Sequence, residues 1–118
     1  FVMILDALQL RLLEKIRSDL AGYSVVRSTS PLDNRAIWLE IFAGGIHKGN
    51  SCQTLLKKLN INCKEVAGLG NDYNDIDFLD ICAEAYLVAN APVNLQRHYK
   101  LVRSDKEEGF TEFISKVL

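Results

Sequence analysis

The chain has 118 residues, of which 48% are hydrophobic and 25% are charged, so its composition is that of an ordinary globular protein of at most one domain and excludes a disordered segment. Fourteen basic residues against fifteen acidic ones leave a net charge of −1, which excludes a broad electrostatic surface for nucleic acid or anionic lipid. No apolar run approaches the roughly 18–20 residues that a membrane span needs, and we expect a cytoplasmic protein that binds neither nucleic acid nor membrane.

The first part of the chain predicts one helix among three short strands. Residues 2–5 form an apolar run typical of a strand, and Asp6 is placed to cap a helix that ends near Gly22. Two β-rich runs, 23–27 and 37–42, are separated by turn-forming residues, which predicts an antiparallel hairpin or two neighbouring edge strands. Residues 1–45 are therefore expected to fold as a β-α-β-β unit.

After Gly44-Gly45, helices and strands alternate along the chain. The expected strands are residues 65–69, 85–89 and 101–102. The expected helices are one capped by Asn50 or Ser51, one over 75–82, a short turn over 93–97, and a closing helix that carries Phe110 and Phe113. This alternation indicates βαβ units and a parallel sheet, so residues 46–118 predict half of a doubly wound α/β sheet. Half a sheet leaves an edge and an apolar face uncovered, and the chain begins with Phe1, so we expect it to be incomplete on its N-terminal side.

Three cysteines, Cys52, Cys63 and Cys82, are an odd number without CxxC spacing. A metal site or a reactive thiol is one interpretation. The sequence favours the simpler one, in which the three are small buried residues that stay reduced.

Polar side chains crowd the end of the apolar run that precedes Gly70. Asn71, Asp72, Asn74 and Asp75 fall within five residues, between a predicted strand and a predicted helix. Ligands of open α/β sheets bind at the carboxyl ends of the strands, and the hard oxygens of these side chains suit Mg²⁺. The alternative is a polar turn in which Asn74 or Asp75 only caps the helix.

Two further residues stand at similar places. Lys48 precedes Gly49 and a predicted helix, where an ammonium group and the helix N-terminus together suit a phosphate; alternatively, it is a solvated surface lysine. Asn90 follows the predicted strand 85–89, where its side chain holds neighbouring loops or makes a simple turn.

Taken together, the order Lys-Gly, strand, Gly-x-x-x-Asn-Asp, helix, strand, Asn-Ala resembles the C-terminal portion of the haloacid dehalogenase superfamily, in particular its large-cap, Cof-type phosphatases. The acidic segment from Ser104 to Gly109 resembles the one that precedes the last helix of that family. The resemblance implies an α/β fold in which residues 46–118 are the C-terminal half of a Rossmannoid core and residues 1–45 are the end of an α/β cap.

The resemblance also implies the roles of the site residues. Lys48 would contact the phosphoryl group, Asn74 would orient the loop, and Asn90 would be the family's site asparagine. The implied Mg²⁺ ligands are Asn71, Asp72 and Asp75. Asn71 stands where the family has its first acidic ligand, so the site loses one negative charge, for which Asp72 would compensate if its side chain turns inward.

One element of the family pattern is missing from these residues. The family attacks phosphate with an aspartate of a strand-Asp-x-Asp motif, whereas Asp6 is followed by Ala7 and Leu8 and is better explained as a helix cap. Without an activated carboxylate, covalent phosphoryl transfer has no first step. We therefore expect the C-terminal part of a Mg²⁺-dependent phosphatase of small phosphorylated metabolites such as sugar phosphates, inactive when alone.

Two other functions compete with this hypothesis. The first is a non-catalytic module, derived from such a phosphatase, that associates with itself or with a partner through an exposed sheet edge. The second is a dinucleotide-binding protein, but Gly68-Leu69-Gly70 continues to Tyr73 where the fingerprint requires a third glycine.

Overall fold

The computed structural model describes residues 1–30, 32 and 36–118 of the chain. They form two compact units, Phe1–His47 and Lys48–Leu118. Part of the turn predicted between the two β-rich runs of the first unit, namely Pro31, Asp33 and Asn34, lies outside the described residues. Among those described, no helix is long and apolar enough to cross a membrane.

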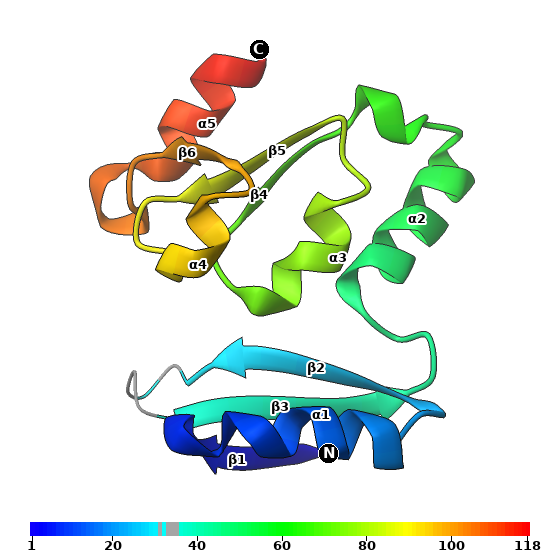
Figure 1. Ribbon diagram of the computed structural model, residues 1–118. Coiled ribbons are helices and arrows are strands. Elements are labelled where there is room, and N and C mark those ends of the chain that lie inside the picture. The colour runs from blue at the N-terminus through cyan, green and yellow to red at the C-terminus, as the bar shows by residue number, and fades with distance from the viewer. Residues whose placement is uncertain (31, 33–35) are drawn as a thin grey trace. The chain divides into compact units, whose positions relative to one another are not determined.

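The first unit is an antiparallel sheet with one helix against it (Figure 1). Its elements are β1 (Val2–Asp6), the 3-10 turn η1 (Ala7–Gln9), α1 (Leu10–Asp19), β2 (Tyr23–Thr29) and β3 (Ala36–Ala43). The strand order is β1-β3-β2, and β2 and β3 pair antiparallel, so of the two alternatives the hairpin is the correct one. Leu5, Leu13, Ile37 and Leu39 form the core between helix and sheet.

The second unit is a parallel sheet of three strands in the order β4-β5-β6 (Figure 1). Its strands are β4 (Ala67–Gly70), β5 (Glu84–Val88) and β6 (Lys100–Val102). Its helices are α2 (Lys48–Leu59), α3 (Ile76–Leu79), α4 (Val93–Gln96) and α5 (Gly109–Val117), with 3-10 turns η2 (Cys63–Glu65), η3 (Tyr73–Asp75) and η4 (Asp105–Glu107). Tyr86 and Leu87 of β5 lie in the core of this unit. The Tyr86 ring packs edge-on against the Phe113 ring of α5, with 5.4 Å between the ring centroids.

Several predicted boundaries are wrong. The second helix begins at Lys48 and not after Asn50 or Ser51, which lie inside it. Glu65 is not in a strand, because Asn62 and Glu65 form a reciprocal capping box around η2. The helix predicted over 75–82 ends at Leu79.

The cysteines are all free thiols, but Cys63 is exposed and the other two are half-buried, so the expectation of three buried cysteines is also wrong.

Candidate functional site

The three parallel strands of the second unit end at one edge of its sheet. Gly70 of β4 pairs with Leu87 of β5, and Val88 pairs with Val102 of β6. The loops that begin at Asn71, Ala89 and Arg103 therefore leave the sheet on the same side. This is the edge at which open α/β sheets bind ligands.

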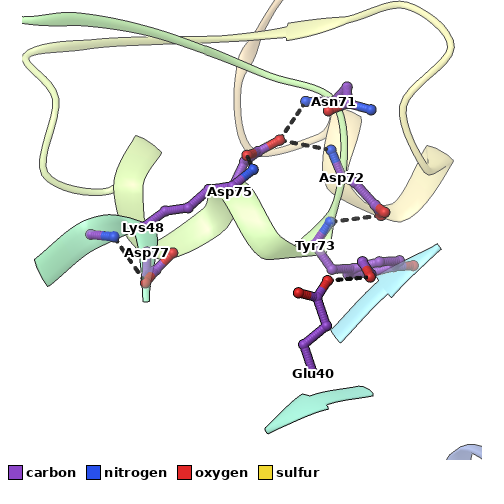
Figure 2. A network of polar contacts seen from close by, with 9 residues as sticks. Glu40, Lys48, Asn71, Asp72, Tyr73, Asp75 and Asp77 are labelled. Carbon is purple, nitrogen blue, oxygen red and sulfur yellow. Dashed lines mark hydrogen bonds and ion pairs between the residues drawn. The ribbon is translucent and has the colours of Figure 1, made fainter. Parts of the chain in front are cut away.

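Asp75 is the most firmly held side chain at this edge. It is 5% exposed, and its Oδ2 accepts hydrogen bonds from the backbone N–H groups of Asn71 at 2.8 Å and Asp72 at 3.2 Å (Figure 2). Asp72 in turn caps η3, and its Oδ1 accepts from the N–H of Tyr73 at 2.7 Å. The two aspartates thus form a capping box that fixes the polar loop after β4.

Gly70 makes room for this arrangement. A Cβ at position 70 would lie 2.8 Å from the Cβ of Asp75 and 3.1 Å from its Oδ2. The loop therefore turns back onto the end of β4 more closely than a side chain would permit. This approach gives a physical reason for the glycine and the aspartate of the Gly-x-x-x-Asn-Asp pattern.

Lys48 meets Asp75 across 27 residues of sequence. Its ammonium group forms an ion pair with Asp75 Oδ1 (Figure 2), on the carboxylate oxygen that the backbone N–H groups leave free. Gly49 explains how Lys48 reaches this place: its N–H donates to Asp77 Oδ2 at 3.1 Å, and a Cβ at position 49 would lie 2.5 Å from the backbone oxygen of Asp77. The Lys-Gly pair therefore lets the start of α2 dock closely on α3.

The remaining candidate residues differ in how they are engaged. Asn71 is exposed, whereas the Oδ1 atom of Asn74 is buried and has no hydrogen-bond partner within the described part of the chain. Asn90 is hydrogen-bonded to the loop after β6: its Nδ2 donates to Asp105 Oδ1 at 2.8 Å, and its Oδ1 accepts from the N–H of Asp105 at 3.2 Å. The structure thus brings Lys48 and the polar loop together and gives Asn90 a different partner.

Sequence reasoning missed two aspartates at this site. Asp77 anchors the start of α2, and Asp105 clasps Asn90. Asp105 lies in the acidic segment 104–109, so a signal for it existed, but its partner lies 15 residues away and pairs with it only through the fold. Asp77 receives the N–H of Gly49 from 28 residues away, and no local spacing predicts that.

The donor set of the loop is chemically suited to Mg²⁺. Asp72 and Asp75 offer carboxylate oxygens and Asn71 an amide oxygen, all on one turn. No group of three or more His, Cys, Asp or Glu side chains able to hold a metal occurs among the described residues. Mg²⁺ commonly uses only one or two carboxylates and fills its other positions with water and substrate phosphate, so these residues fit the ion.

Comparison with known proteins identifies the family. A family model described as haloacid dehalogenase-like hydrolase matches residues 4–114. The protein named "Putative phosphatase M6_Spy0533" of Streptococcus pyogenes serotype M6 is 26% identical over 95 residues, which are 80% of this chain and 33% of that protein. The chain spans about a third of the length of the curated relatives it matches.

Solved structures agree with the fold. SMU.1108c from Streptococcus mutans UA159 superposes with a TM-score of 0.77 at 26% identity, over 98% of this chain and 44% of that one. BT4131, described as a sugar phosphatase of haloacid dehalogenase subclass IIB, superposes with a TM-score of 0.75 at 13% identity, over 98% of this chain and 42% of that one. The resemblance stated from the motifs and the predicted α/β fold are confirmed. This chain belongs to the haloacid dehalogenase-like hydrolases.

Proposed function

We propose that the chain supplies the lysine and the acidic loop of the active site of a Mg²⁺-dependent phosphatase whose substrate is a small phosphorylated metabolite. The observation that carries the proposal is the meeting of the Lys48 ammonium group with the Asp75 carboxylate at the carboxyl edge of the parallel sheet. A cation for the phosphoryl group and an oxygen ligand for a metal are thereby side by side. A phosphate dianion and Mg²⁺ need these two groups within reach of one another.

Lys48 is proposed as the group that contacts the phosphoryl oxygens. Its side chain is 50% exposed and stands at the first residue of a 12-residue helix. A charge-assisted hydrogen bond from its ammonium group offsets part of the phosphate charge, and the helix N-terminus adds to that effect. Lys48 in this role acts on the substrate directly.

Asp75 is proposed as the fixed metal ligand, with Asn71 and Asp72 beside it. Bound Mg²⁺ supplies neutralisation of the phosphoryl oxygens on which negative charge accumulates. The backbone N–H groups that bind Asp75 Oδ2 hold the carboxylate in one orientation. Asn74 is proposed to orient the loop, and Asn90 to place the neighbouring loop through Asp105.

The attacking carboxylate is proposed to come from residues other than these 118. Asp6 ends a strand, but its Oδ1 accepts the N–H of Leu8 at 2.8 Å as the cap of η1. Asp75 and Asp77 are separated by one residue, yet the first pairs with Lys48 and the second with Gly49. On this proposal the chain alone binds Mg²⁺ and phosphate but does not hydrolyse a phosphomonoester.

The substrate class is proposed from the same site. Lys48 and a metal recognise the phosphoryl group and place no demand on what the phosphate is attached to. BT4131 is described as a sugar phosphatase, which supports a phosphorylated sugar as the first substrate to test. The remainder of the substrate is recognised by other residues.

The experiment is calorimetric titration of orthophosphate into the purified chain at saturating Mg²⁺. Lys48→Ala should weaken phosphate binding by about tenfold or more, because a charge-assisted hydrogen bond is lost. Lys57→Ala, an exposed lysine in the last turn of the same helix, is the matched control and should leave binding unchanged. Equal phosphate affinity of Lys48→Ala and the unaltered chain would refute the proposal, and Mg²⁺-dependent hydrolysis of p-nitrophenyl phosphate by the chain would refute its inactivity.

A further inference from the structure

On the proposed function, one oxygen atom of Asp75, Oδ1, is a binding partner for two cations: the Lys48 ammonium group and the metal ion. Asp75 Oδ2 already accepts two backbone N–H groups, and Oδ1 accepts the ammonium group of Lys48. A metal ion held by Asp75 therefore approaches the carboxylate where the ammonium group now lies. Two cations bound to one oxygen repel each other, so each binds Asp75 Oδ1 more weakly when the other is present.

The two partners of this ion pair differ in freedom. The Asp75 side chain is 6% exposed and bound to the loop backbone, whereas the Lys48 side chain is 50% exposed. A lysine ammonium group is a compact charge on a flexible four-carbon stem, and it moves at small cost. When a metal arrives, Lys48 is the partner that moves.

We propose that Lys48 competes with the metal for Asp75 Oδ1, so that metal binding releases the ammonium group to an incoming phosphate. This inference rests on the proposed function and adds an order of events to it. Without metal, Asp75 holds the ammonium group and weakens its attraction for anions. With metal bound, the same group is unpaired at the edge of the sheet. Phosphate and Mg²⁺ then strengthen each other's binding by equal factors, as linkage requires.

The architecture permits this exchange without loss of the fold. The start of α2 is anchored by the hydrogen bond from the Gly49 N–H to Asp77 Oδ2 and by the close approach of Gly49 to the Asp77 backbone. These contacts do not involve the Lys48 ammonium group. The helix therefore stays docked on α3 whether or not Lys48 is paired with Asp75.

The test is a titration of the chain with Mg²⁺ alone, followed by the amide resonances of Asn71 and Asp72, whose N–H groups report on Asp75. Lys48→Met removes the charge and keeps most of the length of the side chain, and it should tighten Mg²⁺ binding about two- to fivefold, the range set by a half-exposed ion pair. Lys57→Met is the matched control: it lies nine residues along α2, roughly 13 Å by helix rise, and should leave Mg²⁺ affinity unchanged.

A second measurement needs no variant. In the unaltered chain, the ε-methylene resonance of Lys48 should move toward that of a free lysine as Mg²⁺ saturates the site; a resonance that stays fixed overturns the inference. Equal Mg²⁺ affinity of Lys48→Met and the unaltered chain also overturns the competition, while leaving Asp75 as a metal ligand. Absence of Mg²⁺ binding in both would remove the proposed function and this inference together.

Discussion

A Cβ at Gly70 would lie 2.8 Å from the Cβ of Asp75, so only a glycine at the end of β4 lets the Asp75 side chain approach the strand this closely. The consequence reaches beyond packing. Asp75 receives both backbone N–H groups and the Lys48 ammonium group in this position. The residue that makes the site compact is thus one with no side chain.

Gly70→Ala should destabilise the chain and disturb the loop. An added methyl group must displace Asp75 or Leu79, whose Cδ1 would lie 2.9 Å away, and such overpacking costs about 1–3 kcal/mol. Urea unfolding measures the loss, and Mg²⁺ titration should show weakened binding. Gly22→Ala is the control, because a Cβ there meets nothing within 4 Å, and its free energy of unfolding should change by less than about 0.5 kcal/mol. Equal stability of the two variants would contradict the steric explanation.

Asn71→Asp should strengthen Mg²⁺ binding. Asn71 is exposed and its backbone N–H bonds to Asp75, so a carboxylate at position 71 adds a negative charge beside the proposed metal position. Affinity for hard cations rises with the number of charged ligands, and we expect a gain of about fivefold or more in Mg²⁺ affinity by calorimetry.

Asn62→Asp is the matched control for that substitution. Asn62 caps η2 and lies on the amino-terminal side of β4, at the opposite end of the strand from Asn71. Aspartate caps helical turns as well as asparagine does, so the fold is kept and the net charge changes equally. A similar gain in both variants would mean that total charge, and not a ligand at position 71, governs Mg²⁺ binding.

Asp72→Asn distinguishes the capping role of Asp72 from a metal role. Asparagine keeps the cap on η3, so the free energy of unfolding should stay within about 0.5 kcal/mol. If Asp72 contributes charge to the proposed metal site, Mg²⁺ affinity falls, and Asp75→Asn lowers it further because the loop then loses its fixed ligand. Unchanged Mg²⁺ affinity in Asp72→Asn would leave Asp72 as a structural cap alone.

How far the sequence predicted the structure depends on the range of each interaction. Short apolar runs that alternate with helical patterns predicted the parallel strands, because a buried β-strand consists of apolar residues that follow one another in the sequence. Helix and turn boundaries were less accurate. The capping boxes of Asn62 with Glu65 and of Asp72 with Asp75 form 3-10 turns at places where the periodicity favoured a strand or a longer helix.

The site shows the same division. The polar loop was predictable, since its residues adjoin one another. The resemblance implied that Lys48 and the polar loop serve one site, but the ion pair of Lys48 with Asp75 was not predicted, because 27 residues separate the two. The sequence offered a loop-holding role for Asn90 beside a simple turn, but it did not identify Asp105 as the partner, since that pair depends on the neighbouring places of β5 and β6 in the sheet. Long-range pairs of polar residues are where the sequence alone falls short.

Cys82 should be the slowest of the cysteines to react with iodoacetamide. Its Sγ donates to the backbone oxygen of Phe78 at 3.3 Å, and burial raises the pKa of the Cys82 thiol to about 11, with smaller contributions from Cys52 and Cys63. Only the thiolate is nucleophilic, and at pH 8 about one Cys82 in a thousand is ionised. Mass spectrometry of the alkylated chain should find the exposed Cys63 modified first.

The same pKa predicts how stability depends on pH. The unfolded chain loses the Cys82 proton near the ordinary thiol pKa of about 8.5, whereas the folded chain keeps it until about pH 11. Between these two values the folded state binds more protons than the unfolded state. The free energy of unfolding therefore falls as the pH rises through this window. Cys82→Ala should therefore lose less stability than the unaltered chain between pH 8 and pH 10.5 in urea unfolding. Cys63→Ala, which changes an exposed thiol and removes only the smallest of the three causes of the raised Cys82 pKa, should retain most of the pH dependence. Identical pH profiles for the unaltered chain and Cys82→Ala would show that folding does not perturb this thiol.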